Sequence, residues 1–341
     1  MINSLSDGEL PPIRTTGIGS WPGTDMTDAI KIAFAECPDL PYLPELPARG
    51  PHAQLIGRST AFLAGLAVDL QPAGWRLTDA SGRDHRIAIS MLRSDLDLLE
   101  EHIQGYQGAV KLSVAGPWTL AAMMERPRGD RVLADSGARR DLCQSLAEGT
   151  AQLVAELVRR LPDIEPLIQL DEPMLPAVLA GTIANASGLS RHRAIEPNEI
   201  SSAMIYTRER LAPTPIAMHC CAADPPIELL RLAGASGVLL DIDQLSGPDW
   251  DQVAATLEAG PWVGMGALPT DDRPSPNQFG PDLLARRVLQ PLRDLGLEPP
   301  VAARIVITPA CGLDSMSRDR AVGALRTLRS AAQIVTEQLA D

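Results

Sequence analysis

Short apolar runs alternate with segments of helical periodicity along most of the chain. In residues 141–161, for example, Leu142, Leu146, Leu153 and Leu157 fall on one face of a helix. The runs that predict strands are residues 15–20, 40–46, 110–116, 166–171, 215–220, 237–242, 261–266 and 304–309. A strand followed by a helix, repeated eight times, is the pattern of a parallel barrel. We therefore predict the α/β class and a single (β/α)8 TIM barrel.

The second of these strands has the least regular pattern. Pro41 and Pro44 interrupt residues 40–46, and Pro47 follows them directly. Proline is poorly tolerated inside a hydrogen-bonded ladder. We expect only a short extended piece at this place in the barrel.

The chain reads as one domain over residues 1–341, with an N-terminal tail at residues 1–14. Between the second and third strands, residues 54–68 have a helical pattern. Residues 74–90 carry apolar alternation on both sides of Ser81-Gly82, which predicts an excursion hairpin outside the barrel.

Composition excludes several classes of partner. The net charge is -13 with a pI of about 4.9, and an acidic surface does not attract nucleic acid or an anionic membrane. Five cysteines without regular spacing do not make a disulfide framework. No apolar run is long enough to span a membrane, and the start of the chain lacks the pattern of an export signal. We expect a soluble cytoplasmic protein with a small-molecule ligand.

In barrels of this type, chemistry is found at the C-terminal ends of the strands. Polar or metal-binding groups follow most of the predicted strands. They are Gly19-Ser20, Glu45, Gly116-Pro117-Trp118-Thr119, Asp171-Glu172, His219-Cys220-Cys221, Asp241 and Asp243, and Cys311-Gly312. We expect them to meet at one mouth of the barrel.

A candidate metal site lies in this set. His219 and Cys221 are two residues apart at a strand end, so their side chains point the same way and Cys220 points the other way. Imidazole and thiolate are preferred ligands of Zn²⁺. Cys311 could reach this pair across the mouth, and Asp243 could add an oxygen ligand. Packing of the same residues in the core remains an alternative at this point.

Motifs at five strand ends resemble those of one family, in the same order. They are Thr15-Thr-Gly-Ile-Gly-Ser, Ala115-Gly-Pro-Trp-Thr, Ile168-Gln-Leu-Asp-Glu-Pro, Met218-His-Cys-Cys and Pro309-Ala-Cys-Gly-Leu. The chain resembles the catalytic barrel of cobalamin-independent methionine synthase, within the superfamily of zinc-dependent thiol methyltransferases and uroporphyrinogen decarboxylases.

The resemblance implies a zinc ligand set. His219, Cys221 and Cys311 match the family's His and Cys ligands, and the family's Glu ligand falls on Asp243 in this chain. Because Asp is one methylene shorter than Glu, Asp241 is an alternative for this position.

The resemblance also implies a homocysteine site on the first-strand backbone and on two carboxylates. An ammonium group suits the carboxylates, and a substrate carboxylate suits the backbone. The expected contacts are Ile18, Gly19, Ser20, Glu45, Trp118, Asp171 and Glu172. Two alternatives remain open, namely that Asp171-Glu172 caps a helix and that Trp118 only closes the barrel mouth.

The chain departs from the family's pattern in two respects. The family has a His after the seventh strand, thought to assist the leaving group, whereas residues 264–273 contain none and only Asp271 and Asp272 offer a proton-bearing group. We count both, with Asp171, as catalytic candidates. The family's second barrel, which helps to hold the folate, is also missing, and this favours methylcobalamin or a corrinoid protein as donor over methyl-folate.

The expected activity is zinc-dependent methyl transfer to a thiol, with homocysteine as acceptor and methionine as product. Zinc lowers the pKa of a bound thiol, and the thiolate is the nucleophile. Two alternatives are a related transferase with another thiol acceptor and a barrel that binds zinc or a ligand without turnover.

Overall fold

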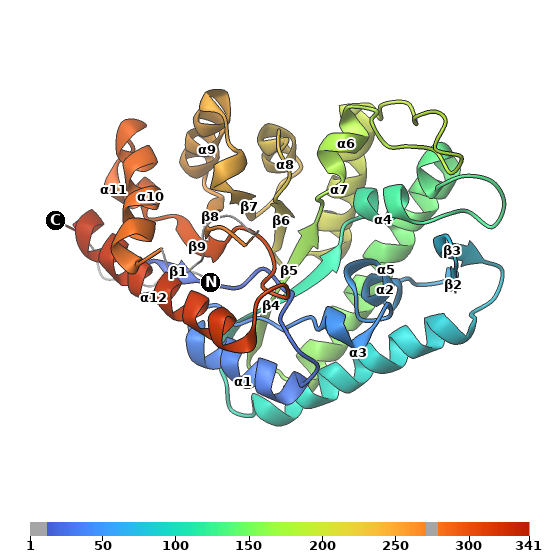
Figure 1. Ribbon diagram of the computed structural model, residues 1–341, viewed down its shortest axis with the longest axis horizontal. Coiled ribbons are helices and arrows are strands. Elements are labelled where there is room, and N and C mark those ends of the chain that lie inside the picture. Colours follow the sequence, from blue (N-terminus) through green and yellow to red (C-terminus); the bar gives the residue numbers. More distant parts are fainter. Residues whose placement is uncertain (1–11, 271–278, 341) are drawn as a thin grey trace.

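The computed structural model describes residues 12–270 and 279–340, and Figure 1 shows a sheet of parallel strands curled inside a layer of helices. Seven strands lie in the order β1-β9-β8-β7-β6-β5-β4. They are β1 (Arg14–Thr15), β4 (Gly108–Ala115), β5 (Ile164–Asp171), β6 (Ile216–Cys220), β7 (Gly237–Asp241), β8 (Trp262–Leu268) and β9 (Ile305–Pro309). The predicted barrel fold is confirmed.

The predicted second strand closes the sheet between β1 and β4 without forming a regular ladder. Its Tyr42 bridges Lys111 on β4, and its Glu45 bridges Ser20, which follows β1. The Leu43 N–H donates to the Lys111 carbonyl at 2.9 Å. The three prolines in and beside this segment have no N–H to donate, which accounts for isolated bridges in place of a continuous strand.

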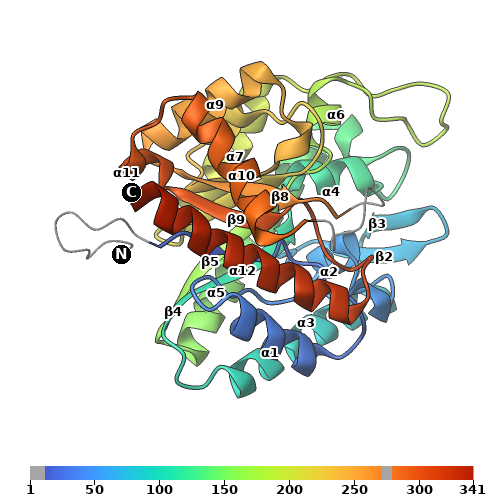
Figure 2. The ribbon, with the colours of Figure 1, turned by 60° about the vertical axis from the view of Figure 1, so that its left-hand side comes forward.

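Helices surround the sheet, and α12 runs along the outside of β9 and β1 (Figures 1 and 2). The α-helices are α1 (Met26–Glu36), α2 (Leu55–Thr60), α3 (Arg83–His102), α4 (Pro117–Met123), α5 (Ser136–Arg160), α6 (Leu175–Leu179), α7 (Pro197–Leu211), α8 (Ile227–Leu232), α9 (Gly247–Ala259), α10 (Pro281–Asp294), α11 (Pro299–Ala302) and α12 (Arg318–Ala340). Short 3-10 turns are η1 (Pro47–Arg49), η2 (Val132–Ala134) and η3 (Ile242–Gln244).

The excursion hairpin exists, but not at residues 74–90. It pairs β2 (Ala67–Gln71) with β3 (Gly74–Thr78) and projects from the barrel (Figure 2). Gly74 has a φ of 126°, which a residue without Cβ adopts freely in a tight turn.

The rest of the expected hairpin is helical. Residues 83–102 form α3, which buries Ala88, Leu92, Leu96 and Leu99 on one face. That four-residue spacing is helical, and it outweighs the short alternation near residue 87. The helix expected over residues 54–68 is correspondingly shorter, because its end belongs to β2. The expected tail of residues 1–14 ends earlier than predicted, since Arg14 already lies in β1, and residues 1–11 lie outside the described residues.

The barrel interior has an apolar layer with polar side chains above it. The apolar layer is separate from the main core between sheet and helices, and it comprises Ile18, Leu40, Leu167, Ala217, Leu239 and Val306. One alternation further along β4 and β5, the inward positions are Lys111, Ser113 and Gln169, all at most 1% exposed. Asp171 and His219 come next, at the mouth. Strand alternation thus changes the interior from apolar to polar toward the C-terminal ends.

Glu172, directly after β5, binds the N-terminus of α4. Its Oε1 accepts from the Trp118 N–H at 3.0 Å, and its Oε2 accepts from the Thr119 N–H and hydroxyl at 2.8 Å. These donors have no partner inside the helix, and a negative charge is favourable at this end. Burial raises the Glu172 pKa to about 7, against the opposing effect of these hydrogen bonds.

The fit between Glu172 and α4 predicts that Gly116 cannot carry a side chain. A Cβ on Gly116 would overlap the Glu172 carboxylate, which is held in place by three hydrogen bonds. We expect Gly116→Ala to lower the free energy of unfolding by about 1–3 kcal/mol. Gly323→Ala in α12 is the control, because its Cβ meets nothing within 4 Å, and we expect it to stabilise the protein by about 0.5–1 kcal/mol. Equal stabilities of the two variants in denaturant titrations would contradict this account.

Candidate metal centre

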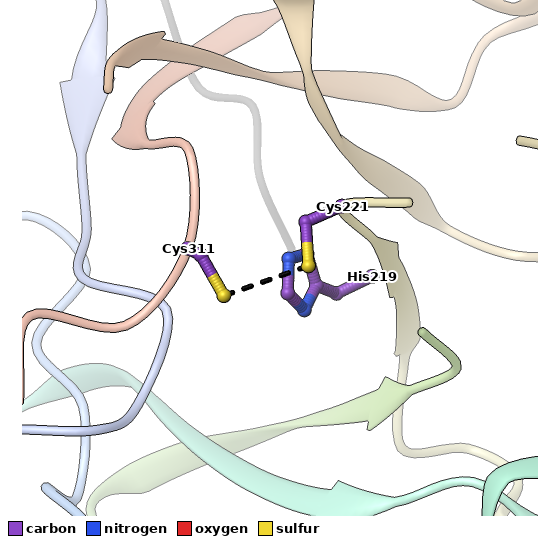
Figure 3. Close-up of side chains that lie close together, drawn as sticks. All are labelled: His219, Cys221 and Cys311. Atoms are coloured by element: carbon purple, nitrogen blue, oxygen red, sulfur yellow. Dashed lines mark hydrogen bonds between the residues drawn. The ribbon is translucent and has the colours of Figure 1, made fainter. Parts of the chain in front are cut away.

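One imidazole and two thiols meet at the C-terminal mouth of the barrel (Figure 3). His219 lies on β6, Cys221 follows that strand, and Cys311 follows β9. Their ligand atoms all lie within 4.8 Å of one another, and the two Sγ atoms are 3.5 Å apart. The predicted convergence of these three residues is therefore present in the structure.

The alternation of β6 selects the ligands. His219 and Cys221 project to the inside of the mouth, and the sulfurs and the ring face one another in Figure 3. Cys220 is fully buried and is not part of the cluster. Cys37 and Cys143 are also buried elsewhere, as expected for core thiols.

Two glycines let the chain after β9 bring Cys311 to the site. A Cβ on Gly266 of β8 would lie 2.8 Å from the Ala310 Cα, and a Cβ on Gly312 would lie 2.6 Å from the Ser20 Cβ. Real Cβ atoms do not approach other carbons so closely. The loop with Cys311 therefore passes tightly between the end of β8 and the residues after β1.

Asp171 fixes the orientation of the His219 ring. The two residues are neighbours in the parallel pair β5–β6, and His219 Nδ1 lies 2.7 Å from Asp171 Oδ1. Because a carboxylate only accepts, Nδ1 carries the proton, and in the neutral ring Nε2 presents its lone pair. Nε2 is buried and makes no hydrogen bond to any described residue. A buried acceptor without a partner is costly, and a metal ion would satisfy it.

The three groups influence one another's protonation. Burial lowers the His219 pKa, but the hydrogen bond and charge of Asp171 outweigh it, so that the pKa is raised overall. The hydrogen bond between the thiols lowers the pKa of Cys311 to about 6 and, with burial, raises that of Cys221.

The donor set fits zinc. Two sulfurs bound tetrahedrally at about 2.3 Å from Zn²⁺ lie about 3.8 Å apart, close to the 3.5 Å between Cys221 and Cys311. The carboxylate behind His219 is the usual outer partner of a histidine that binds a metal. Three protein ligands with a remaining position are typical of a catalytic zinc site rather than a structural one.

Asp243, expected as the fourth ligand, forms an ion pair with another element. Asp243 lies in η3, and its Oδ1 pairs with Arg287 of α10 at 2.6 Å. Asp241, the alternative, accepts from the Asp243 N–H at 3.0 Å. Among the described residues, neither carboxylate belongs to the group within 4.8 Å, and a fourth ligand from Asp243 or Asp241 stays a prediction. The turn of η3 and the Arg287 cation on α10 are partners that sequence spacing does not reveal.

Glu45 reaches the mouth with a partner of its own. Its Oε1 accepts from Arg58 of α2 at 3.0 Å, and both side chains are almost fully buried. Burial raises the Glu45 pKa to about 7, although Arg58 opposes the shift. Breaking such a buried pair leaves an uncompensated charge. The expected contact of Glu45 with a substrate ammonium would therefore compete with Arg58.

The other expected substrate contacts differ in accessibility. The Ser20 side chain lies beside Gly312, next to Cys311, and the Ser20 N–H donates to no described residue. Trp118 is 3% exposed and packs in the main core. Glu172 is fully buried and binds the N-terminus of α4, not that of the helix after its own strand, and its expected contact with the substrate stays a prediction.

Two residues behind the site were not singled out from the sequence. Lys111 and Gln169 are fully buried inside the barrel, and Gln169 Nε2 donates to Asp171 Oδ1 at 2.7 Å. A sequence signal for them exists. Lys111 is two positions before Ser113 and Gln169 is two before Asp171, so each shares a strand face with a polar residue nearer the mouth. Asp271 and Asp272, the other catalytic candidates, lie outside the described residues.

A cavity of about 850 Å³ opens at the opposite end of the barrel, where its lining includes Arg14, Glu165, Trp262 and Arg304. These residues lie at the N-terminal ends of strands, and the apolar layer separates them from the cluster. Active sites of barrels form at the other end. Within the described ranges, no helix has the length and hydropathy needed to cross a membrane.

Comparison with solved structures supports the barrel fold. A B12-independent methionine synthase from Shewanella sp. W3-18-1, solved in complex with selenomethionine, matches with a TM-score of 0.65 at 13% identity, over 96% of this chain and 99% of that chain. A methylaspartate ammonia lyase from Clostridium tetanomorphum, mutant L384A, matches with a TM-score of 0.47 at 11% identity, over 96% of this chain and 60% of that chain. The curated proteins give no significant match.

A family model matches most of the chain. The model described as the catalytic domain of cobalamin-independent synthase matches residues 13–334, which is nearly all of the described barrel. The chain therefore belongs to the cobalamin-independent methionine synthase family, and it is a methyltransferase.

Proposed function

We propose that the protein transfers a methyl group to the thiol of homocysteine at a zinc ion held by His219, Cys221 and Cys311. The observation that carries the proposal is the buried, unpartnered Nε2 of His219 facing two thiols at the mouth of the barrel. Zinc, when bound, supplies the Lewis acidity that converts a substrate thiol to a thiolate at neutral pH.

The protein's own residues would orient the acceptor beside the ligands. The Ser20 N–H is available for a substrate carboxylate, and Ser20 is in close contact with Gly312, the neighbour of Cys311. The Asp171 side chain, 8% exposed, would face the substrate ammonium while it holds His219. An amino-acid thiol bound by both groups would have its sulfur near the three ligands.

The transfer forms a sulfur–carbon bond as the bond between the methyl group and the donor breaks. The thiol proton is lost, and the departing donor group needs a proton in return. Asp271 and Asp272 are our proposed source of that proton.

The donor that we propose is a methyl-folate rather than a corrinoid. The matching family is described as cobalamin-independent, and the Shewanella protein, called B12-independent, is covered over 99% of its chain by this single barrel. A single barrel therefore does not by itself favour a corrinoid donor, contrary to our expectation from the sequence.

A different thiol acceptor is the second candidate. The observation in its favour is the Glu45–Arg58 pair, which neutralises one of the two carboxylates expected to hold an ammonium group. A thiol that carries a carboxylate but no amino group would leave this pair intact.

Zinc analysis of ligand variants tests the metal centre. We expect about one zinc per chain in the wild-type protein by elemental analysis, and little zinc in Cys311→Ala, because two ligands cannot hold the ion tightly. Cys220→Ala is the matched control, since this thiol is adjacent in sequence but packs in the core, and it should retain the metal. Full zinc content in Cys311→Ala would rule out the proposed ligand set.

Methyl-transfer assays test the reaction. We expect methionine from homocysteine and methyltetrahydrofolate, no product with methylcobalamin, and no product from the Cys311→Ala protein. Product with methylcobalamin alone would overturn the proposed donor. Absence of product with either donor, despite bound zinc, would overturn the proposed activity.

The choice of acceptor is tested by comparing homocysteine with 3-mercaptopropionate, a thiol without an ammonium group. We expect a higher kcat/KM for homocysteine, because Asp171 would favour its ammonium group. A preference for 3-mercaptopropionate would instead support the second candidate.

A further inference from the structure

The polar residues inside the barrel form a connected chain of hydrogen bonds that ends at the metal centre. Lys111 Nζ lies 2.5 Å from Gln169 Oε1 and 2.8 Å from the Ile18 carbonyl oxygen. Gln169 Nε2 donates to the same carbonyl at 2.9 Å and to Asp171 Oδ1 at 2.7 Å. Asp171 in turn accepts from His219.

Lys111 determines which way the Gln169 amide points. An ammonium group has only donors, so the Gln169 atom beside it must be the carbonyl oxygen. The amide NH₂ then faces Asp171 and the Ile18 carbonyl, both of which are acceptors. Reversing the amide would place donors against the ammonium and an acceptor against both oxygens, so a single orientation is allowed.

Gln169 contributes one of the two hydrogen bonds that hold Asp171 Oδ1, and His219 contributes the other. The two donors approach the same oxygen from the strand of Asp171 and from the neighbouring strand. Without Gln169, the only remaining donor of these two would be the His219 ring itself. The Asp171 carboxylate and the ring could then rotate together.

The Ile18 carbonyl is fixed by three donors, because Ser113 Oγ also lies 3.0 Å from it. This carbonyl begins the Ile18–Ser20 segment, where we place the acceptor's carboxylate. Gln169 is therefore the one described side chain that binds both this segment and the carboxylate behind His219.

We propose that Gln169, oriented by Lys111, is a positioning residue that couples the backbone of the acceptor site to the metal ligand His219. The inference rests on the proposed metal centre. Outer residues that orient a histidine ligand commonly change metal affinity by about 10–100-fold when they are removed.

The test is metal binding by Gln169→Met, which keeps the length of the side chain and removes its hydrogen bonds. We expect the zinc dissociation constant, measured by competition with a chromophoric chelator, to rise about 10–100-fold. We also expect the absorption bands of the cobalt(II)-substituted protein to shift, because the His219 ring is no longer fixed.

Ser113→Ala is the matched control. It removes a donor whose hydrogen bond goes to the same Ile18 carbonyl and not to Asp171, so its zinc affinity and cobalt spectrum should stay near those of the wild type. An equal loss of zinc affinity in both variants would attribute the effect to the Ile18 carbonyl or to general packing. It would overturn the proposal that Gln169 acts on His219 through Asp171.

A double variant separates positioning from folding. Gln169→Met leaves the Lys111 ammonium with one acceptor fewer, which destabilises the protein. Lys111→Met/Gln169→Met removes both partners and should recover stability in thermal unfolding, while zinc affinity stays low. Recovery of affinity together with stability would show that Gln169 acts only through folding.

The outcomes also distinguish this inference from the proposed function. If the wild-type protein binds no zinc, the metal centre itself fails. If it binds zinc and Gln169→Met keeps both the affinity and the cobalt spectrum, only the positioning role is overturned.

Discussion

The burial of a single ammonium group constrains the interior of this barrel. Lys111 is fully buried, and burial lowers its pKa to about 8, against the favourable charges of Asp171 and Glu45. A buried cation requires acceptors on all sides. The Ile18 carbonyl and the Gln169 amide oxygen provide them, and each of these groups is thereby fixed for its role at the mouth. The Tyr42 ring, 5.4 Å away, offers its face to the same cation.

The site depends on this layer because its reactive groups come from different strands. His219 lies on β6, Cys221 follows that strand and Cys311 follows β9, while the segment proposed for the acceptor follows β1. No local sequence element holds them together. Their relative positions are determined by the closure of the barrel and by the polar contacts that fill it.

Much of the fold could be predicted from the sequence, because strand-ending motifs and helical periodicity are local signals. The hairpin was predicted too far along the chain. The short apolar alternation near residue 87 is part of α3, whose helical pattern is visible only over its whole length. The convergence of His219, Cys221 and Cys311 could also be predicted, since alternation and strand order along the barrel determine where these side chains lie.

Other parts of the site depend on tertiary partners that no local pattern contains. Asp243 pairs with Arg287 of a distant helix, and Glu172 turns toward the N-terminus of α4. Lys111 and Gln169 look like isolated polar residues in apolar strands. The register of β4 against β5 pairs Gln169 with Ser113, one inward position beyond Lys111, and the long Lys111 side chain then reaches the Gln169 amide oxygen.

The proline-interrupted segment at residues 40–46 is the part of the barrel wall with an irregular backbone ladder. Hydrogen bonds from only a few residues, such as those of Leu43 to Lys111 and of Glu45 to Gly19, join it to its neighbours, whereas β4 and β5 are paired from Gly108 to Ala115. The segment is therefore held mainly by the burial of its side chains, since Tyr42, Leu43 and Leu46 are at most 1% exposed. Because Cys311 follows β9, which pairs with β1 next to this segment, the packing of these side chains also supports the barrel wall on the Cys311 side of the mouth.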